Sequence, residues 1–135
     1  MFAPLLSALL LLAEPAYDPA VRAAMWTLME DTRYGFAVTE EAMFIVRERD
    51  GRLSFIRWSS LGEPHQALWT GIVPAGAVAI AHTHPNTRPR PSAVDENTAR
   101  RSGLLVYVVT RDRIMRTDGG AAKTVVRGSW WRGLS

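Results

Sequence analysis

The chain of 135 residues contains no cysteine. Disulfide bonds and thiolate zinc sites are therefore excluded, and any metal site must use His, Asp or Glu side chains. Lysine is nearly absent as well, because Lys123 is the only lysine among the 16 Lys and Arg residues. The net charge is only +3, and no stretch combines dense basic residues with interleaved aromatics, so we expect no nucleic-acid partner.

The sequence also lacks an apolar run long enough to span a membrane. Its longest such run covers residues 5–13, whereas a transmembrane helix needs about 20 residues. No Lys or Arg precedes this run, since the first is Arg22. Residues 1–16 are therefore either a signal peptide or an N-terminal helix that packs on the domain. The first alternative implies a secreted or periplasmic protein, and the second a cytoplasmic one.

Residues 17–135 have the length of one domain and contain no repeat or linker. Asp18 and Pro19 are typical of a helix start, and apolar residues then recur at helical spacing to about Asp31. A second helix is predicted over 92–102, because Gly103 is a common residue just past a helix end.

Strands are expected where apolar residues alternate or form short buried runs. Asp50-Gly51 predicts a two-residue hairpin turn between the first two strands, and residues 59–71 read as a loop. The predicted strands cover residues 42–47, 52–58, 77–81, 104–110, 114–116 and 124–127. This order of helices and strands predicts a mixed α/β sandwich.

His82 and His84 follow the short apolar strand directly, and the chain has only three histidines. Alternate residues of a strand point to one face, so two imidazoles about 6.6 Å apart along the backbone can converge on one ion. Two histidines and one carboxylate form a common catalytic zinc set, and Asp95 is the natural third ligand. However, Ser92-x-x-Asp95 also matches a helix capping box, which explains the pair without a metal.

The complete pattern is His82-Thr83-His84-Pro85, then Ser92-x-x-Asp95, with seven residues between His84 and Ser92. This pattern resembles the signature of the JAMM metalloproteases, also called MPN-plus proteins. The resemblance covers about residues 20–127 and is to a compact, prokaryotic-type member. It implies a cytidine-deaminase-like α/β sandwich, with a mixed sheet and flanking helices.

By this resemblance, His82, His84 and Asp95 would bind one zinc ion per chain, and Ser92 would stabilise the oxyanion. An upstream glutamate would act as the general base. The implied activity is hydrolysis of an amide bond in a protein or peptide substrate. The resemblance leaves the oligomeric state and the identity of the substrate open.

Two neighbouring residues, Glu40 and Glu41, are candidates for the upstream glutamate. They point to opposite faces once the strand has begun, so only one of them can face the metal. We favour Glu40, because the small residue Ala42 follows two positions later, as in many family members. Neither glutamate is followed at the third position by the glycine that members often carry, since Met43 and Phe44 stand there.

Two other functions stay open. The first is a catalytically inactive module of the same fold that is used for binding or assembly, which gains support if both glutamates point away from the metal. The second is a metal-dependent phosphoesterase, which we rank last because such sites usually need more carboxylates and often a second metal. Arg88 and Arg90, between the expected ligands, are interpreted as solvated loop residues, with attraction of an acidic or C-terminal carboxylate group of a substrate as the alternative. His65 is interpreted as a surface residue.

Overall fold

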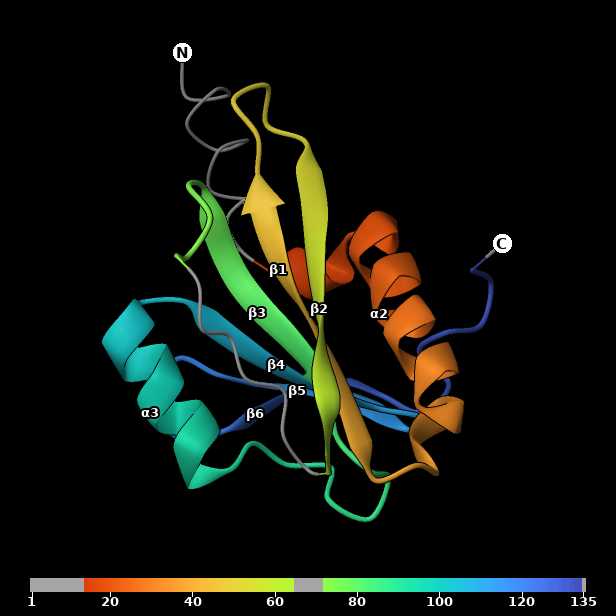
Figure 1. Cartoon of the computed structure of the whole chain (residues 1–135). Coiled ribbons are helices and arrows are strands. Elements are labelled where there is room, and N and C mark those ends of the chain that lie inside the picture. Colours follow the sequence, from red (N-terminus) through yellow and green to blue (C-terminus); the bar gives the residue numbers. More distant parts are fainter. Residues whose placement is uncertain (1–13, 65–71, 135) are drawn as a thin grey trace.

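The computed structural model describes residues 14–64 and 72–134 of the chain. They form a single small α/β domain around one mixed six-stranded sheet, with strand order β2-β1-β3-β4-β5-β6 (Figure 1). Neighbouring strands are antiparallel except β3 and β4, which run parallel. The strands are β1 (Thr39–Arg47), β2 (Leu53–Pro64), β3 (Ala77–Thr83), β4 (Leu105–Thr110), β5 (Arg113–Thr117) and β6 (Lys123–Arg127). The α/β class expected from the sequence is confirmed.

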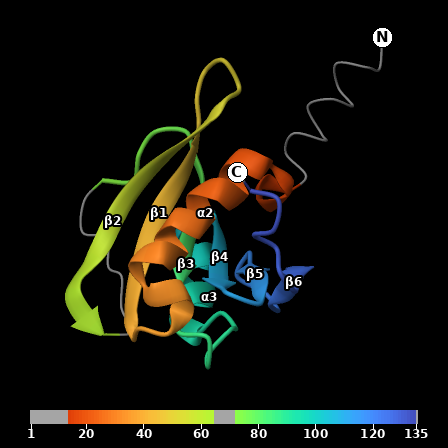
Figure 2. The ribbon, with the colours of Figure 1, turned by 90° about the vertical axis from the view of Figure 1, so that its right-hand side faces the viewer.

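The helix α2 (Pro19–Asp31) covers one face of this sheet (Figure 2). It begins as predicted, because the Asp18 side chain accepts a hydrogen bond from the Ala20 amide at 2.8 Å. A 3-10 turn precedes it, η1 (Pro15–Tyr17), and another follows it, η2 (Arg33–Gly35). Its apolar face packs into the main core with the odd-numbered residues of β1 and β3–β4, including Met43, Ile45, Ala79, Ala81, Tyr107 and Val109.

The helix α3 (Ala93–Ser102) connects β3 to β4 and lies on the opposite face of the sheet (Figure 1). Two parallel strands require such a crossover connection. A smaller apolar cluster lies on this side, with Phe44 and Val46 from β1 and Leu104 before β4. Because side chains alternate along a strand, the even-numbered residues of β1, and those of β3 from Ile80 onward, face α3. This alternation determines which polar side chains of β1 and β3 lie on the face of the sheet that α3 covers.

The second strand is longer than predicted. The interpretation of 59–71 as a loop is wrong for residues 59–64, because β2 continues to Pro64 and pairs there with the start of β1. Pairing with a neighbouring strand outweighs the weak strand propensity of Gly and Pro. The remaining residues, 65–71, which include His65, lie outside the described part.

Two other boundaries differ from the prediction. The connection between β1 and β2 is longer than a two-residue turn, because the Glu48 amide donates to the Arg52 carbonyl and Gly51 takes a φ of 89°. Longer hairpin loops commonly place a glycine in this left-handed conformation. The third strand extends to Thr83, so His82 lies within β3 and His84 immediately after it.

The described chain begins in contact with the main core. Ala16 is buried, and its carbonyl accepts a hydrogen bond from Arg22 Nε at 2.8 Å. Glu14 accepts a hydrogen bond from the Tyr107 hydroxyl and pairs with Arg116 at 2.8 Å. Residues 1–13 lie outside the described part, so both interpretations of the N-terminal run stay predictions. Within the described ranges, no helix has the length and apolar character of a membrane span.

Candidate metal centre

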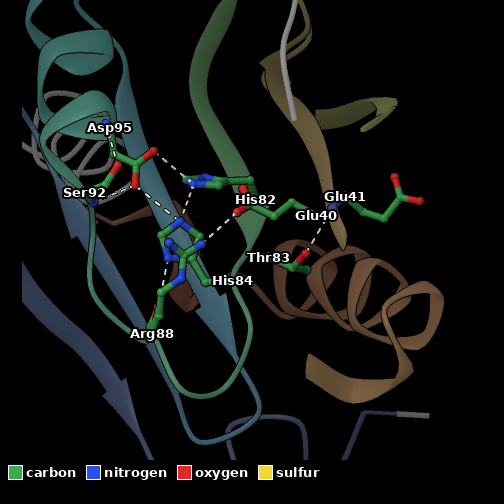
Figure 3. A network of polar contacts seen from close by, with 8 residues as sticks. All are labelled: Glu40, Glu41, His82, Thr83, His84, Arg88, Ser92 and Asp95. Carbon is green, nitrogen blue, oxygen red and sulfur yellow. Dashed lines mark hydrogen bonds and ion pairs between the residues drawn. The ribbon is translucent and has the colours of Figure 1, made fainter. Parts of the chain in front are cut away.

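Two histidine rings converge at the end of β3. His82 and His84 are both buried, and their Nε2 atoms lie 3.0 Å apart (Figure 3). Their spacing of two residues directs both side chains to the face covered by α3, as predicted. Two ring nitrogens at this separation inside the protein need a shared proton or a shared cation.

Asp95 faces both rings from the first turn of α3. Its Oδ1 lies 3.1 Å from His82 Nε2, and its Oδ2 lies 3.4 Å from His84 Nε2. The same carboxylate also accepts a hydrogen bond from the Ser92 amide at 2.8 Å, while Ser92 Oγ accepts one from the Asp95 amide at 3.1 Å. The capping box and the cluster with the histidines are therefore compatible, and one carboxylate serves both.

The orientation of His84 is set by its own loop. His84 Nδ1 lies 2.9 Å from the backbone carbonyl of Arg88. A carbonyl can only accept a hydrogen bond, so Nδ1 carries the proton and Nε2 presents its lone pair. Metal-binding histidines are commonly oriented by such a second contact. The lone pair of Nε2 is directed at His82 and Asp95, where a cation would lie.

Glu40 reaches the same group from the neighbouring strand β1. It is only 4 % exposed, and one of its carboxylate oxygens lies within 4.8 Å of ligand atoms of both His82 and His84. The guanidinium of Arg88 approaches the carboxylate, with 3.4 Å between Nη2 and Oε2. Sequence analysis considered Arg88 as a solvated residue or as a partner of a substrate carboxylate, and nothing in its position in the chain indicated this contact with Glu40.

Glu41 lies outside the cluster. Its side chain points away from the histidines, toward the side of the sheet where α2 ends (Figure 3). Partial burial raises its pKa, an effect that Arg57 opposes and Asp31 reinforces. Those two residues form a salt bridge of 2.6 Å near the end of α2. Of the two candidate glutamates, the structure therefore brings Glu40 and not Glu41 to the histidines.

A residue that sequence analysis did not single out helps to place Glu40. Thr83, between the two histidines, is fully buried, and its Oγ1 accepts a hydrogen bond from the Glu41 amide at 3.0 Å. The β1–β2 pairing shifts register at this point, between Thr39 and Glu41. The Thr83 hydroxyl therefore ties an irregular part of β1 to the strand that carries the histidines.

Asn86 was also missed, although it follows the histidine pair closely. Its side-chain amide donates to the Tyr34 carbonyl at 2.9 Å, and its Oδ1 accepts from the Arg111 amide at 3.0 Å. Its backbone amide donates to the Gly35 carbonyl at 2.9 Å. Asn86 thus links the loop after β3 to two segments far away in the sequence. A single asparagine in a loop carries no pattern that predicts this.

The charges of the cluster are strongly coupled. Burial acts to lower the pKa of His82, but the nearby Asp95, with a contribution from Glu40, outweighs it and the pKa is raised. Burial acts to raise the pKa of Asp95, but the two histidines and the Ser92 amide hold it far below its usual range. Each member of the His82–Asp95 pair therefore favours the charged form of the other.

The geometry can be compared with that of a four-coordinate metal site. Ligand atoms at about 2.0–2.1 Å from a tetrahedral metal lie about 3.3 Å from one another. The contacts among His82, His84 and Asp95 measure 3.0, 3.1 and 3.4 Å, although Asp95 faces the two rings with different oxygens. Glu40, His82 and His84 also meet closely enough to hold a metal ion. The residues present fit a metal centre.

Comparison with known families finds a match over part of the chain. Residues 75–132 match the model of the prokaryotic homologs of the JAB domain. This match supports a JAB/MPN-family domain. The α/β architecture with its mixed sheet is consistent with the JAB fold, and the JAB family includes hydrolases. No curated protein and no solved structure matches the chain.

The matched JAB segment contains four of the five predicted site residues: His82, His84, Ser92 and Asp95. Glu40 lies upstream of it, in β1. The antiparallel pairing of β1 with β3, in which Ala42 faces His82, brings Glu40 next to the matched segment. The family match therefore says nothing about Glu40. Its place in the cluster follows from the pairing of β1 with β3.

Proposed function

We propose that this protein is a JAMM-type zinc hydrolase that cleaves an amide bond in a protein or peptide substrate. The observation that carries this proposal is the convergence of His82, His84 and Asp95 with the buried carboxylate of Glu40 on one face of the sheet. Glu40 completes the set, because three ligands alone would account for metal binding but not for proton transfer.

Zinc is the metal that this donor set favours. Imidazole nitrogens and a carboxylate are usual zinc ligands, and three protein ligands leave a fourth position for water or substrate. The Arg88 carbonyl supports this assignment, since it holds His84 in the tautomer that a metal requires. We expect one zinc ion per chain, bound by His82, His84 and Asp95.

When bound, zinc would polarise the scissile carbonyl and lower the pKa of a coordinated water to about 7. The Glu40 carboxylate would accept the proton of the attacking water and then donate it to the leaving amine nitrogen. Burial of Glu40 shields this transfer from bulk water, and the contact with Arg88 holds the carboxylate in place. Thr83 would act indirectly by fixing the part of β1 that carries Glu40.

Ser92 would stabilise the oxyanion of the tetrahedral intermediate. Its Oγ already accepts a hydrogen bond from the Asp95 amide, so the hydroxyl proton is available for another acceptor. Ser92 is exposed at the helix N-terminus, where a substrate can reach it. A hydroxyl held in advance by the capping box would stabilise negative charge that develops beside the metal.

The arrangement favours an active amide hydrolase over the alternatives. An inactive binding module would have no need for a buried acid that points toward the histidines, as Glu40 does. A two-metal phosphoesterase would need a second cluster of ligands, and the described ranges contain the one group formed around His82 and His84.

Metal analysis tests the proposal directly. The purified wild-type protein should contain about one zinc ion per chain, and Asp95→Ala and His84→Ala should lose it. Glu96→Ala is the matched control, because it removes the neighbouring acid of α3 and should keep the metal. Unchanged zinc content in both ligand variants would show that the assigned site is wrong. Peptide hydrolysis that chelation abolishes and zinc restores would complete the test.

A further inference from the structure

An apolar cavity of about 270 Å³ lies beside the candidate metal centre, on the α3 face of the sheet. His82 and Asp95 form part of its wall, so the cavity borders the metal ligands directly. The rest of the lining is contributed by strands β1–β4, by Val73 before β3, and by α3. A group held in this cavity would lie next to any bond that is cleaved at the metal.

The sheet supplies a rigid apolar wall. Phe44 of β1 and Trp58 of β2 pack against each other, with ring centroids 4.6 Å apart. Ile80 and Val106 come from the next two strands, and Phe44 and Val106 are almost fully buried. Residues packed this closely have little freedom to collapse into the space. The cavity is therefore a feature of the folded domain.

The helix α3 supplies the opposite wall through one stripe of side chains. Val94, Thr98 and Ser102 are spaced four residues apart, so they lie above one another on a single helix face. Val94 is 69 % exposed although it is apolar and lies next to Asp95. An exposed valine at the rim of an apolar cavity is placed to contact a ligand that enters it.

The size and chemistry of this cavity indicate its ligand. Pockets for complete small-molecule ligands commonly measure about 300–1,000 Å³, so this space suits a single side chain. Apart from His82 and Asp95, the described residues of its lining offer as polar side-chain groups the hydroxyls of Thr98 and Ser102 and the indole N–H of Trp58. Asp95 is already engaged by the two histidines, and the other polar groups are neutral, so a charged side chain would be poorly compensated there. An apolar side chain would instead bury its surface favourably.

We infer that this cavity binds a large apolar side chain, such as leucine or phenylalanine, that flanks the scissile amide of the substrate. This inference rests on the proposed function and narrows its substrate class. Substrates with a glycine at the same position would leave the cavity unfilled and lose the corresponding binding energy. The described residues therefore specify an apolar residue beside the cleaved bond.

Binding can be tested separately from catalysis. Nuclear magnetic resonance titrations of the wild-type protein would use the amides of N-acetyl-leucine, N-acetyl-phenylalanine and N-acetyl-glycine as probes. The leucine and phenylalanine probes should bind about 10-fold or more tightly than the glycine probe and should shift the amide signals of Val94, Thr98 and Val106. Equal affinities for all three probes, or shifts confined to other parts of the domain, would overturn the inference.

A variant that fills the cavity gives an independent test. Thr98→Trp should abolish the preference for the apolar probes, while Arg101→Trp, with the same side chain added outside the lining, should keep it. If Thr98→Trp does not fold, Thr98→Leu provides a smaller obstruction, which should weaken binding several-fold. An unchanged preference in the folded Thr98 variant would contradict the inference.

Peptide cleavage then separates the two proposals. Zinc-loaded protein should cleave peptides with leucine or phenylalanine beside the scissile bond with a kcat/KM about 10-fold or more above that for glycine. Cleavage with equal efficiency would overturn the cavity inference and leave the hydrolase proposal standing. Apolar probes that bind in the cavity without any peptide cleavage would support the cavity inference and count against the hydrolase proposal.

Discussion

At the scale of single residues, the candidate site depends on the alternation of side chains along β1. Glu40 and Glu41 are neighbours with the same chemistry, yet one is buried beside the histidines and the other faces Asp31 and Arg57. Sequence analysis reduced the candidates for the proposed general base to this pair, and alternation required that only one of them could face the histidines. The choice between them depended on where the strand begins, which is set by its pairing with β2 and β3.

This contrast gives a matched pair of variants. Glu40→Gln should retain about one zinc ion per chain but lower kcat by about 10²–10⁴-fold, because the amide cannot accept the proton of the attacking water. Glu41→Gln should keep both the metal and the activity. Zinc content and peptide hydrolysis measured side by side would check this. The proposed role of Glu40 fails if Glu41→Gln is the variant that loses activity.

At the scale of elements, the loop after β3 connects the metal centre to the rest of the domain. Asn86 bonds with the strained turn η2, in which Arg33 and Tyr34 adopt positive φ angles of 52° and 58°. Such conformations persist only where the surroundings hold them. A side chain on Gly35 would collide with Asn86, since its Cβ would lie 2.1 Å from Oδ1. The loop and the turn therefore stabilise each other.

Asn86→Ala should lower the free energy of unfolding by about 1–3 kcal/mol, because it removes the side-chain partners of the Tyr34 carbonyl and the Arg111 amide. Thr87→Ala changes an exposed neighbour in the same loop and should alter stability by less than about 0.5 kcal/mol. Urea denaturation of both variants would measure the difference. Equal stability of the two variants would mean that Asn86 does not anchor the turn.

The elements themselves were largely predictable, because their signals are local. The capping residues Asp18 and Ser92 correctly marked the starts of both helices, and the strand pattern was correct for most of the sheet. The extension of β2 to Pro64 was missed, because pairing between distant segments decides it. The roles of Asn86 and Arg88 were missed for the same reason, since they consist of contacts made only in the folded chain.

At the scale of the whole molecule, the cluster of His82 and Asp95 links stability to pH. In the metal-free protein the raised pKa of His82 stabilises the fold below its ordinary value of 6.5, and this contribution is lost as pH rises through the folded pKa. The lowered pKa of Asp95 stabilises the fold above its ordinary value of 3.8, and that contribution is lost as pH falls. The contributions of His82 and Asp95 together make the metal-free fold most stable between pH 3.8 and pH 6.5.

Chelator-treated protein should therefore lose stability as pH rises above 6.5, the ordinary pKa of histidine, whereas added zinc should stabilise it increasingly over the same rise. The reason for the second effect is that a metal requires a neutral imidazole and competes with the proton on His82. Urea denaturation with and without zinc at several pH values would measure both trends. In Asp95→Asn the pH dependence of the metal-free protein should be much weaker, and an unchanged profile would contradict this account.

The two ends of the described chain both pack on the α2 side of the sheet. Ala16 and Leu134 contact the main core there, and Trp130 packs against Trp26 of α2. The metal centre and its neighbouring cavity lie on the opposite side, next to α3. A fluorescent label attached at Thr27, an exposed residue of α2, would therefore lie on the side away from the candidate metal centre, which suits this domain to assays on immobilised protein.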